Sequence, residues 1–283
     1  MPRQEATNCR QQAVVTVGAN NDGVERDPCA GIIPPTAAVS VSANRTAAEP
    51  VGPPPSAVLW DIDGTLLSSG GVSARAFLDA VAHVTGRRPE GRGLDLGGRI
   101  DPEIADVLLR SVDADPQLVQ VVLTRLRDSA DSWADELRAN VLALPGVVEV
   151  LARLESAGVR QTVVTGNIET VAMLKLRAAN LVPPIDPTAG GYGDSGTTRV
   201  DVAHSAMTRL ALAGWQRSPD TCWIVGDTPR DLQCARALGI RCALVATGRH
   251  SLSSMAALGA DLLLPSLANA DELVDRLMLV DRH

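Results

Sequence analysis

From residue 57 onward, short apolar runs alternate with amphipathic stretches of roughly ten residues, a pattern typical of buried strands separated by helices. The apolar runs predict strands over 57–60, 159–164, 221–225, 241–246 and 260–264. The amphipathic stretches predict helices over 72–85, 101–110, 145–157, 168–179, 200–213, 231–238, 251–258 and 268–279. Such alternation predicts an α/β fold with a doubly wound parallel sheet.

Residues 71–144 interrupt this alternation, because they show only helical patterns between the first two strands. Asp101-Pro102-Glu103 is typical of a helix start, with Asp101 as the N-cap residue and a proline in the first turn. A second Asp-Pro pair at 115–116 predicts a long helix over 116–139. We therefore expect a helical insertion, which is longer than an ordinary connection within an α/β domain.

Residues 1–55 differ from the rest of the chain, since they contain no leucine or phenylalanine and end in a Pro-rich run. Such a segment buries too little apolar surface to offset its ordering entropy, so we expect a disordered extension. Two β-rich pieces, 13–17 and 37–41, leave edge strands as an alternative. A third possibility is that the start codon was assigned upstream of the true one. The expected domains are the extension 1–55, an α/β core of 56–70 and 145–283, and the helical insertion 71–144.

Composition narrows the classes of partner. The net charge of −7 comes without runs of like charge, and one Tyr, one Phe and four Trp give little base-stacking surface, so no nucleic-acid partner is expected. No apolar run has membrane-spanning length and no signal peptide is recognisable, so neither a membrane partner nor export is expected. The five cysteines show no CxxC spacing, which favours free thiols and a cytoplasmic location.

Polar residues that suit catalysis follow three of the predicted strands. Asp61 and Asp63 come directly after strand 57–60, where open α/β sheets keep their chemistry. Thr165-Gly166-Asn167 follows strand 159–164, and Gly226-Asp227-Thr228-Pro229-Arg230-Asp231 follows strand 221–225. Two acids before a glycine also start ordinary turns, but the downstream motifs favour a site.

The segment Asp61-Ile62-Asp63-Gly64-Thr65 resembles the first motif, DxDGT, of the haloacid dehalogenase (HAD) superfamily of aspartate-nucleophile phosphohydrolases. Gly226-Asp227-Thr228-Pro229 is similar to the fourth motif, and the resemblance covers residues 57–265. It implies a Rossmann-like core, a C1 cap formed by the helical insertion as a lid over the site, and Mg²⁺ as cofactor.

The carboxylates suit phosphoryl transfer. Asp61 can attack phosphorus and form an aspartyl-phosphate, and Asp63 can protonate the leaving alcohol and then activate water. The resemblance assigns the backbone carbonyl of Asp63 to the metal, together with Asp61 and Asp227, because Mg²⁺ prefers oxygen ligands. Asp231 is expected to bind the metal or to support its ligands, and the alternative for Asp231 is a plain helix N-cap.

The second motif is expected at Thr165. Its hydroxyl, with the amides of Gly166 and Asn167 at a helix N-terminus, suits a phosphoryl oxygen. An N-cap role for Thr165 is the alternative. Asn167 is equally compatible with a contact to substrate or with holding the loop.

The third motif departs from the family pattern, which usually places a lysine there. Lys175 is the only lysine, and its position within helix 168–179 predicts that it points away from the site. We therefore expect Arg199, at the start of helix 200–213, to contact phosphate and Asp61, the alternative being a surface arginine. Arg99 in the insertion is expected either to contact an anionic substrate or to be solvated. Tyr192 is expected in a loop near the mouth of the site, and Cys222, Cys234 and Cys242 in the core.

These features favour a Mg²⁺-dependent phosphatase, similar to phosphoglycolate phosphatases, acting on a small phosphorylated metabolite. A phosphomutase of the β-phosphoglucomutase type shares all four motifs and stays open. A dehalogenase fits less well, because that chemistry uses the first aspartate without the second, whereas Asp63 is present. A weakly catalytic interaction protein that recruits a partner through residues 1–55 is the rival from another class. The sequence fixes neither the substrate nor the oligomeric state.

Overall fold

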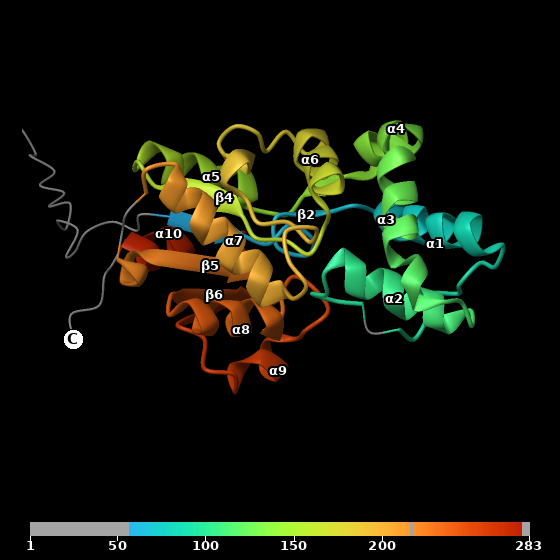
Figure 1. Cartoon of the computed structure of the whole chain (residues 1–283). Helices are drawn as coiled ribbons and strands as arrows, with labels where there is room; N and C mark the ends of the chain where they lie inside the picture. The colour runs from blue at the N-terminus through green and yellow to red at the C-terminus, as the bar shows by residue number, and fades with distance from the viewer. Residues whose placement is uncertain (1–56, 95, 216–217, 279–283) are drawn as a thin grey trace, which may run out of the picture. The chain divides into compact units, whose positions relative to one another are not determined.

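A five-stranded parallel sheet carries the residues that the sequence motifs single out (Figure 1). The computed structural model describes residues 57–94, 96–215 and 218–278. The strands are β1 (Ala57–Trp60), β4 (Arg160–Val163), β5 (Cys222–Gly226), β6 (Arg241–Val245) and β7 (Leu262–Leu264), in the order β4-β1-β5-β6-β7. The predicted α/β class with a parallel sheet is confirmed.

The register of the sheet brings the motif segments to one level. Trp60 at the end of β1 pairs with Val163 of β4 on one side and Val225 of β5 on the other. The next residue, Asp61, donates its backbone N–H to the Val225 carbonyl at 2.9 Å. The three motif loops that follow these strands therefore start side by side at the carboxyl edge of the sheet.

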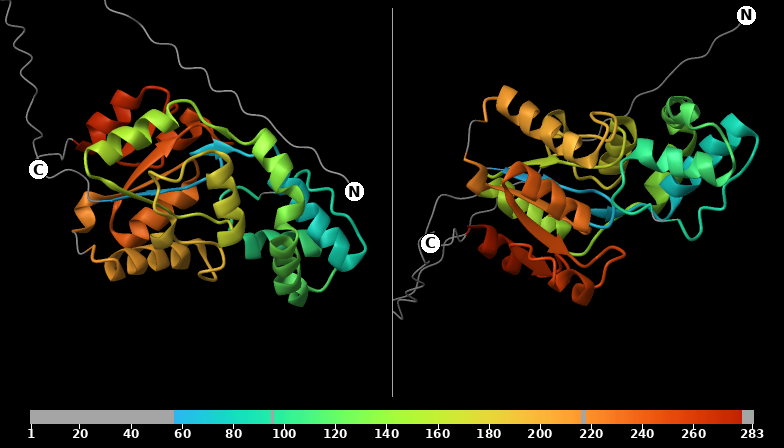
Figure 2. Two further views of the ribbon diagram at one scale, coloured as in Figure 1. Left: turned by 90° about the horizontal axis from the view of Figure 1, so that it is seen from above. Right: turned by 60° about the horizontal axis from the view of Figure 1, so that its bottom comes forward.

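Helices cover both faces of the sheet (Figure 2). Val58 and Trp60 belong to the apolar cluster that includes α5 (Val147–Ser156) and α10 (Ala270–Met278). Their neighbours in β1, Ala57 and Leu59, belong to the cluster that includes α7 (Arg199–Leu212) and α8 (Pro229–Leu238). This alternation follows from the pleat of a strand and explains why β1 is apolar throughout.

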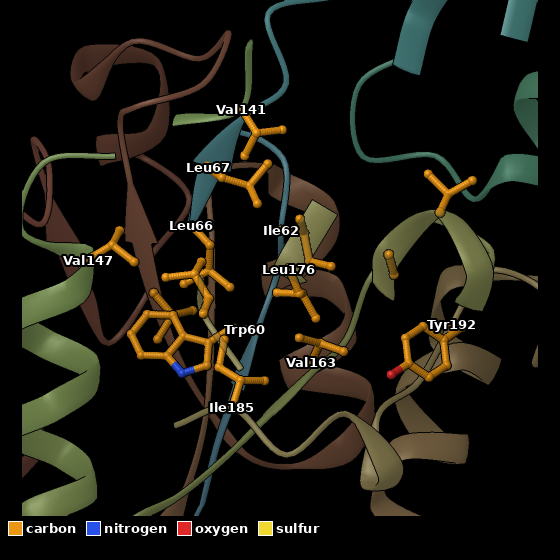
Figure 3. Packing of buried hydrophobic residues seen from close by; sticks show 14 of the residues in the cluster. Trp60, Ile62, Leu66, Leu67, Val141, Val147, Val163, Leu176, Ile185 and Tyr192 are labelled. Atoms are coloured by element: carbon orange, nitrogen blue, oxygen red, sulfur yellow. The ribbon is translucent and has the colours of Figure 1, made fainter. Parts of the chain in front are cut away.

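Trp60 is the largest fully buried side chain of the core (Figure 3). Its indole N–H donates to the side-chain oxygen of Gln161 at 3.2 Å, so the polar atom is satisfied inside the apolar cluster. The remaining core elements are α6 (Glu169–Ala178), α9 (Leu252–Ala256) and the short 3₁₀ turns Pro187–Ala189 and Pro219–Thr221.

In the described part of the helical insertion there are four helices and a 3₁₀ turn. They are α1 (Val72–Thr85), α2 (Asp101–Ser111), the turn Pro116–Leu118, α3 (Val119–Asp128) and α4 (Ala130–Asn140). At its base, β2 (Leu67–Ser68) pairs antiparallel with β3 (Leu142–Ala143), a two-residue pairing too short to show in the sequence pattern. The arrangement suits a C1-type cap, and the domain boundaries given above stay predictions.

The long helix predicted over 116–139 is wrong, because the chain breaks it at Ser129. The Ser129 hydroxyl donates to the Leu126 carbonyl at 3.2 Å, and the Ser132 hydroxyl donates to the Ser129 carbonyl at 2.6 Å. The helix before the break packs on α1 and α2, whereas α4 packs mainly on α6. A change of partner requires a change of direction, which hydrophobic periodicity along the chain does not report.

The predictions for residues 1–55, including the alternative strands over 13–17 and 37–41, lie outside the described residues. Among the described helices, none combines the length and the apolar character needed to cross a membrane.

Candidate active site

A cavity of about 530 Å³ opens at the carboxyl edge of the sheet. Its lining combines core residues with residues of the insertion. They are, among others, Asp61, Asp63, Gly166, Asn167, Lys175, Arg199, Asp227 and Thr228 from the core, and Arg99 and Asp101 from the insertion. Thr165 and Asp231 are buried beside this lining rather than in it. The structure thus brings the expected site residues into one region.

Asp61 and Arg199 form a buried ion pair. The Arg199 Nη2 atom lies 2.8 Å from Asp61 Oδ1 and 2.5 Å from Asp231 Oδ1, so one guanidinium nitrogen joins two carboxylates. Arg199 is the first residue of α7, whose N-cap Thr198 accepts from the Asp201 amide. Burial by itself lowers the pKa of Arg199, but Asp231 and Asp61 raise it well above its usual value. Arg199 is therefore a permanent cation at the expected position.

Asp61, Asp227 and Asp231 form an acidic cluster. They are buried, and each offers a carboxylate oxygen within 4.8 Å of the others. Burial, and then repulsion by Asp231 and Asp63, raise the pKa of Asp61 to about 6 against the opposing effect of Arg199. Burial and repulsion by Asp61 raise the pKa of Asp227 to about 8. The three carboxylates carry more negative charge than Arg199 alone can neutralise. Their oxygen atoms are the ligands that a hard divalent cation such as Mg²⁺ prefers, so the cluster fits such an ion.

Asp227 is held by close contacts that the motif explains. The Thr65 hydroxyl donates to Asp227 Oδ1 at 3.3 Å, a role for the last residue of DxDGT that the sequence analysis missed. Gly64 has φ +84°, and a Cβ there would lie 2.6 Å from Asp227 Oδ2. A Cβ at Gly248 would lie 1.6 Å from the same oxygen. Both positions therefore need glycine for the carboxylate to occupy this place.

Asp231 has two structural partners. Its Oδ2 atom accepts from the Thr228 amide at 3.0 Å and from the Thr228 hydroxyl at 2.7 Å, while Oδ1 accepts from Arg199. Thr228 is the N-cap of α8 and Asp231 is its third residue, so the expected alternative of a plain N-cap at Asp231 is replaced by a capping box. The same carboxylate thus fixes the start of α8 and orients Arg199.

The loop after β4 places Gly166 and Asn167 on the cavity wall. The fully buried Thr165 hydroxyl accepts from the Asn167 amide at 3.3 Å, which is a local turn. The N-cap of α6 is Ile168, so the N-cap alternative for Thr165 is wrong. Gly166 also lets the insertion approach, because a Cβ there would lie 2.1 Å from the Arg99 carbonyl oxygen.

Lys175 does not point away from the site, as the sequence analysis expected, but into it. Its Nζ atom lies 2.5 Å from Asp63 Oδ2 and 2.5 Å from Asn167 Oδ1. The distance along the helix axis misled the prediction, because side chains lean toward the N-terminus of a helix and lysine has a long flexible stem. Its only sequence feature is that it is the one lysine of the chain.

The predicted N-cap role of Asp101 is also wrong, because the N-cap of α2 is Ile100 and Asp101 is the first helical residue. Its Oδ2 atom accepts from the Ile168 amide at 2.8 Å, so Asp101 caps α6 in the core instead of its own helix. Burial raises the pKa of Asp101 to about 7, against the Ile168 hydrogen bond and Lys175. The Asp101 amide in turn donates to the Gly166 carbonyl at 2.7 Å.

Tyr192 is not at the mouth of the site. It is fully buried beside Val163, and its hydroxyl donates to the Pro187 carbonyl at 2.6 Å (Figure 3). The three described cysteines are buried in the core, as expected. Arg99 is half-buried in the cavity lining.

The sequence matches relatives of known description. The chain is 31% identical to tyrosine-protein kinase PtkA of Mycobacterium tuberculosis over 72% of its length, and the match spans 66% of that relative. It is 31% identical to a phosphoglycolate phosphatase of Rhodospirillum rubrum over 73% of this chain and 85% of the relative. A phosphoglycolate phosphatase of Nitrosospira multiformis is 28% identical over 79% of this chain and 97% of the relative.

The fold and the site define a haloacid dehalogenase-type α/β hydrolase. The family model of haloacid dehalogenase-like hydrolases matches residues 58–236, and the chain belongs to this family. Among solved structures, a predicted phosphatase from Clostridium acetobutylicum aligns with TM-score 0.61 at 20% identity, covering 80% of this chain and 99% of that one. CbbY from Rhodobacter sphaeroides aligns with TM-score 0.57 at 20% identity, covering 76% and 95%. The predicted superfamily and the likeness to phosphoglycolate phosphatases are confirmed.

Proposed function

We propose that this chain is a Mg²⁺-dependent phosphatase that forms an aspartyl-phosphate on Asp61 and hydrolyses a small phosphorylated metabolite. The observation that carries the proposal is the buried cluster of Asp61, Asp227 and Asp231 with Arg199, next to a cavity that the insertion helps to line. The phosphoglycolate phosphatases among the relatives support a substrate of that kind.

The reaction proceeds in two displacements. An oxygen of Asp61 attacks phosphorus, the bond from phosphorus to the leaving oxygen breaks, and Asp63 gives that oxygen a proton. Asp63 then takes a proton from water, which attacks phosphorus and breaks the bond to Asp61. Arg199, 2.8 Å from Asp61, is placed to neutralise charge at the phosphoryl oxygens.

Asp61, Asp227 and the backbone carbonyl of Asp63 would hold Mg²⁺, with Asp231 beside them. When bound, the ion would offset the repulsion between these carboxylates and the phosphate dianion. Gly166 and Asn167 line the cavity next to the start of α6, and the amides at such a helix start would suit a phosphoryl oxygen. Arg99 lines the same cavity and suits a second anionic group on the substrate.

The test is phosphate release from a panel of sugar phosphates, phosphoglycolate, nucleotides and an aryl phosphate, with Mg²⁺ and with a chelator. We expect Mg²⁺-dependent turnover that Asp61→Asn abolishes, because the amide cannot attack phosphorus. Asp135→Asn serves as the matched control, because this side chain is exposed at 91% and far from the acidic cluster in sequence. Turnover that survives Asp61→Asn would contradict the assignment of the nucleophile.

The second candidate function is transfer of the phosphoryl group to a hydroxyl group of an acceptor molecule instead of to water. The match to tyrosine-protein kinase PtkA favours this candidate. The check is incubation with ATP labelled at the terminal phosphate and a tyrosine-containing peptide. The only tyrosine of this chain, Tyr192, is fully buried, so label on tyrosine would report transfer to the peptide. Label on the peptide that Asp61→Asn removes would favour the kinase, and phosphate release alone would favour the phosphatase.

A further inference from the structure

The only lysine of the chain is buried beside the second aspartate of the motif. The Lys175 side chain is 3% exposed, and its Nζ atom lies 2.5 Å from Asp63 Oδ2 and 2.5 Å from Asn167 Oδ1. Asn167 closes the triangle, because its Nδ2 atom donates to Asp63 Oδ2 at 3.0 Å. The three side chains therefore hold one another through charged and neutral hydrogen bonds.

A lysine on the buried face of a helix needs a specific reason. Lys175 lies on the same face of α6 as the buried Val171, Ala172 and Leu176, where an apolar residue would ordinarily pack. An ammonium is tolerated there only when it is paired and hydrogen-bonded. Since Asp63 and Asn167 both belong to the site, the burial of Lys175 serves the site and not the apolar core.

Asp63 differs from Asp61 in its surroundings. Asp61 is closely packed and paired with Arg199, whereas the Asp63 side chain is 40% exposed on the cavity wall. A short side chain at such a place has several accessible rotamers, so its direction depends on its partners. Lys175 and Asn167 both bind Oδ2, which leaves Asp63 anchored by one oxygen while the carboxyl group faces the cavity.

We infer that Lys175 is a positioning residue that holds the Asp63 carboxyl group in the place where it exchanges a proton with the leaving oxygen. The inference deepens the proposed function and rests on it, since it assumes that Asp63 is the acid. The Lys175 Nζ atom contacts Asp63 and Asn167, so in this proposal it acts through Asp63.

This role has a signature that loss of structure does not have. An alkyl alcohol leaves phosphorus with a proton from an acid, whereas a nitrophenol leaves as a stable anion and depends little on that proton. The value of kcat/KM reports the steps up to the first displacement, before water attacks the aspartyl-phosphate. A defect in positioning Asp63 must therefore lower kcat/KM for alkyl phosphates much more than for p-nitrophenyl phosphate.

The experiment compares Lys175→Met, Lys175→Arg and Asp63→Asn with the wild-type protein, on an alkyl phosphate and on p-nitrophenyl phosphate with saturating Mg²⁺. We expect Lys175→Met to lower kcat/KM about 100-fold for the alkyl phosphate and only about 3-fold for the aryl phosphate. Lys175→Arg should recover part of the alkyl activity. In the Asp63→Asn background, Lys175→Met should cause no further loss, because its effect passes through Asp63.

Arg177→Met is the matched control, since Arg177 is an exposed basic residue on the same helix, and we expect it to behave as wild type. Equal losses on both substrates, no loss, or a further loss in the Asp63→Asn background would overturn the inference. If Lys175→Met does not fold, Lys175→Gln takes its place, because it keeps hydrogen-bond donors without the charge. Absence of Mg²⁺-dependent turnover in the wild-type protein would instead overturn the proposed function, and the inference with it.

Discussion

At the scale of single residues, each of the two aspartates of the DxDGT motif has a basic partner of its own. Arg199 pairs with Asp61 and Asp231, while Lys175 pairs with Asp63. Buried carboxylates are costly without such partners, and a buried pair that loses one member leaves an uncompensated charge. The two basic residues therefore support both the stability and the chemistry of the site.

Replacing Arg199 tests this point. We expect Arg199→Met to lower the free energy of unfolding by roughly 3 kcal/mol, because it leaves Asp61 and Asp231 without their cation. Phosphatase activity should fall at least about 100-fold, and Arg199→Lys should be intermediate, since ammonium cannot reproduce the geometry of guanidinium. Urea denaturation in a chelator gives the stability.

The matched control for Arg199 is Arg138→Met, which removes an exposed ion pair with Asp135. Exposed pairs contribute little, so we expect a change below about 1 kcal/mol. A loss at Arg138 as large as that at Arg199 would contradict the role of burial.

Asp101 predicts a pH dependence of stability. Its pKa is raised from 3.8 to about 7, so the folded protein binds the proton more tightly than the unfolded chain does. The stabilisation from the protonated form is complete below pH 3.8 and is lost as the pH rises toward 7. The wild-type protein should lose stability from pH 5 to pH 8 as Asp101 ionises, whereas Asp101→Asn cannot ionise there. We therefore expect the free energy of unfolding of Asp101→Asn, relative to that of wild type, to rise by roughly 2 kcal/mol over this range.

The measurement is urea denaturation of both proteins at several pH values, and only their difference is interpreted. The asparagine keeps an oxygen that can accept from the Ile168 amide, so the hydrogen bond to α6 is retained. A difference that is constant across this pH range would show that Asp101 is ionised in the folded protein.

At the scale of elements, the site depends on how closely helices and loops approach one another. Asp101 of α2 caps α6, Asp231 of α8 orients the first residue of α7, and Gly166 lies against the Arg99 carbonyl. The ends of helices thus meet around the cavity, and their free backbone groups bind residues from other elements. Small changes at these ends are expected to alter the site.

Gly166→Ala tests the approach of the insertion to the core. The new Cβ would lie 2.1 Å from the Arg99 carbonyl oxygen, so the loop that carries Arg99 must shift. We expect KM to rise about 10-fold or more, because the cavity wall that the insertion contributes is displaced. Steady-state kinetics of purified protein measure this effect.

Gly97→Ala is the control for that variant, because Gly97 lies in the insertion loop that carries Arg99 and its Cβ would make only an ordinary contact of 3.8 Å with Arg249. We expect nearly unchanged KM. Similar increases in KM in both variants would show that any added side chain near the cavity has this effect, and would remove the close approach as the explanation.

At the scale of the whole molecule, binding of Mg²⁺ is coupled to folding. An ion that binds the folded cluster and not the unfolded chain stabilises the protein, by about 2.7 kcal/mol at a concentration 100 times its Kd. The wild-type melting temperature should therefore rise with Mg²⁺ and fall again with chelator.

Asp227→Asn should lose this response, because it removes one of the three clustered carboxylates. Without Mg²⁺ the same variant should be as stable as wild type or more so, since burial and repulsion raise the pKa of Asp227 to about 8. A full Mg²⁺ response in Asp227→Asn would exclude this cluster as the metal site.

A structural feature of this protein could be predicted from the sequence when residues close together in the chain determine it, and not when it depends on contacts between distant residues. The strands and most helices were predictable, because hydrophobic periodicity and turn residues act over a few neighbours. The long helix over 116–139 was predicted wrongly, because the break at Ser129 depends on which helices each half contacts. Asp61 and Asp227 were identifiable because each directly follows a strand and lies in a motif.

The sequence by itself determined the alternation of strands and helices and the polar residues at the carboxyl ends of β1, β4 and β5, since both are local properties of the chain. Only the tertiary structure decided the roles of Lys175 and Asp101. Lys175 meets Asp63 across 112 positions, and Asp101 meets Ile168 across 67. Such contacts depend on how α6 packs against β1 and the insertion, and no pattern of neighbouring residues specifies them.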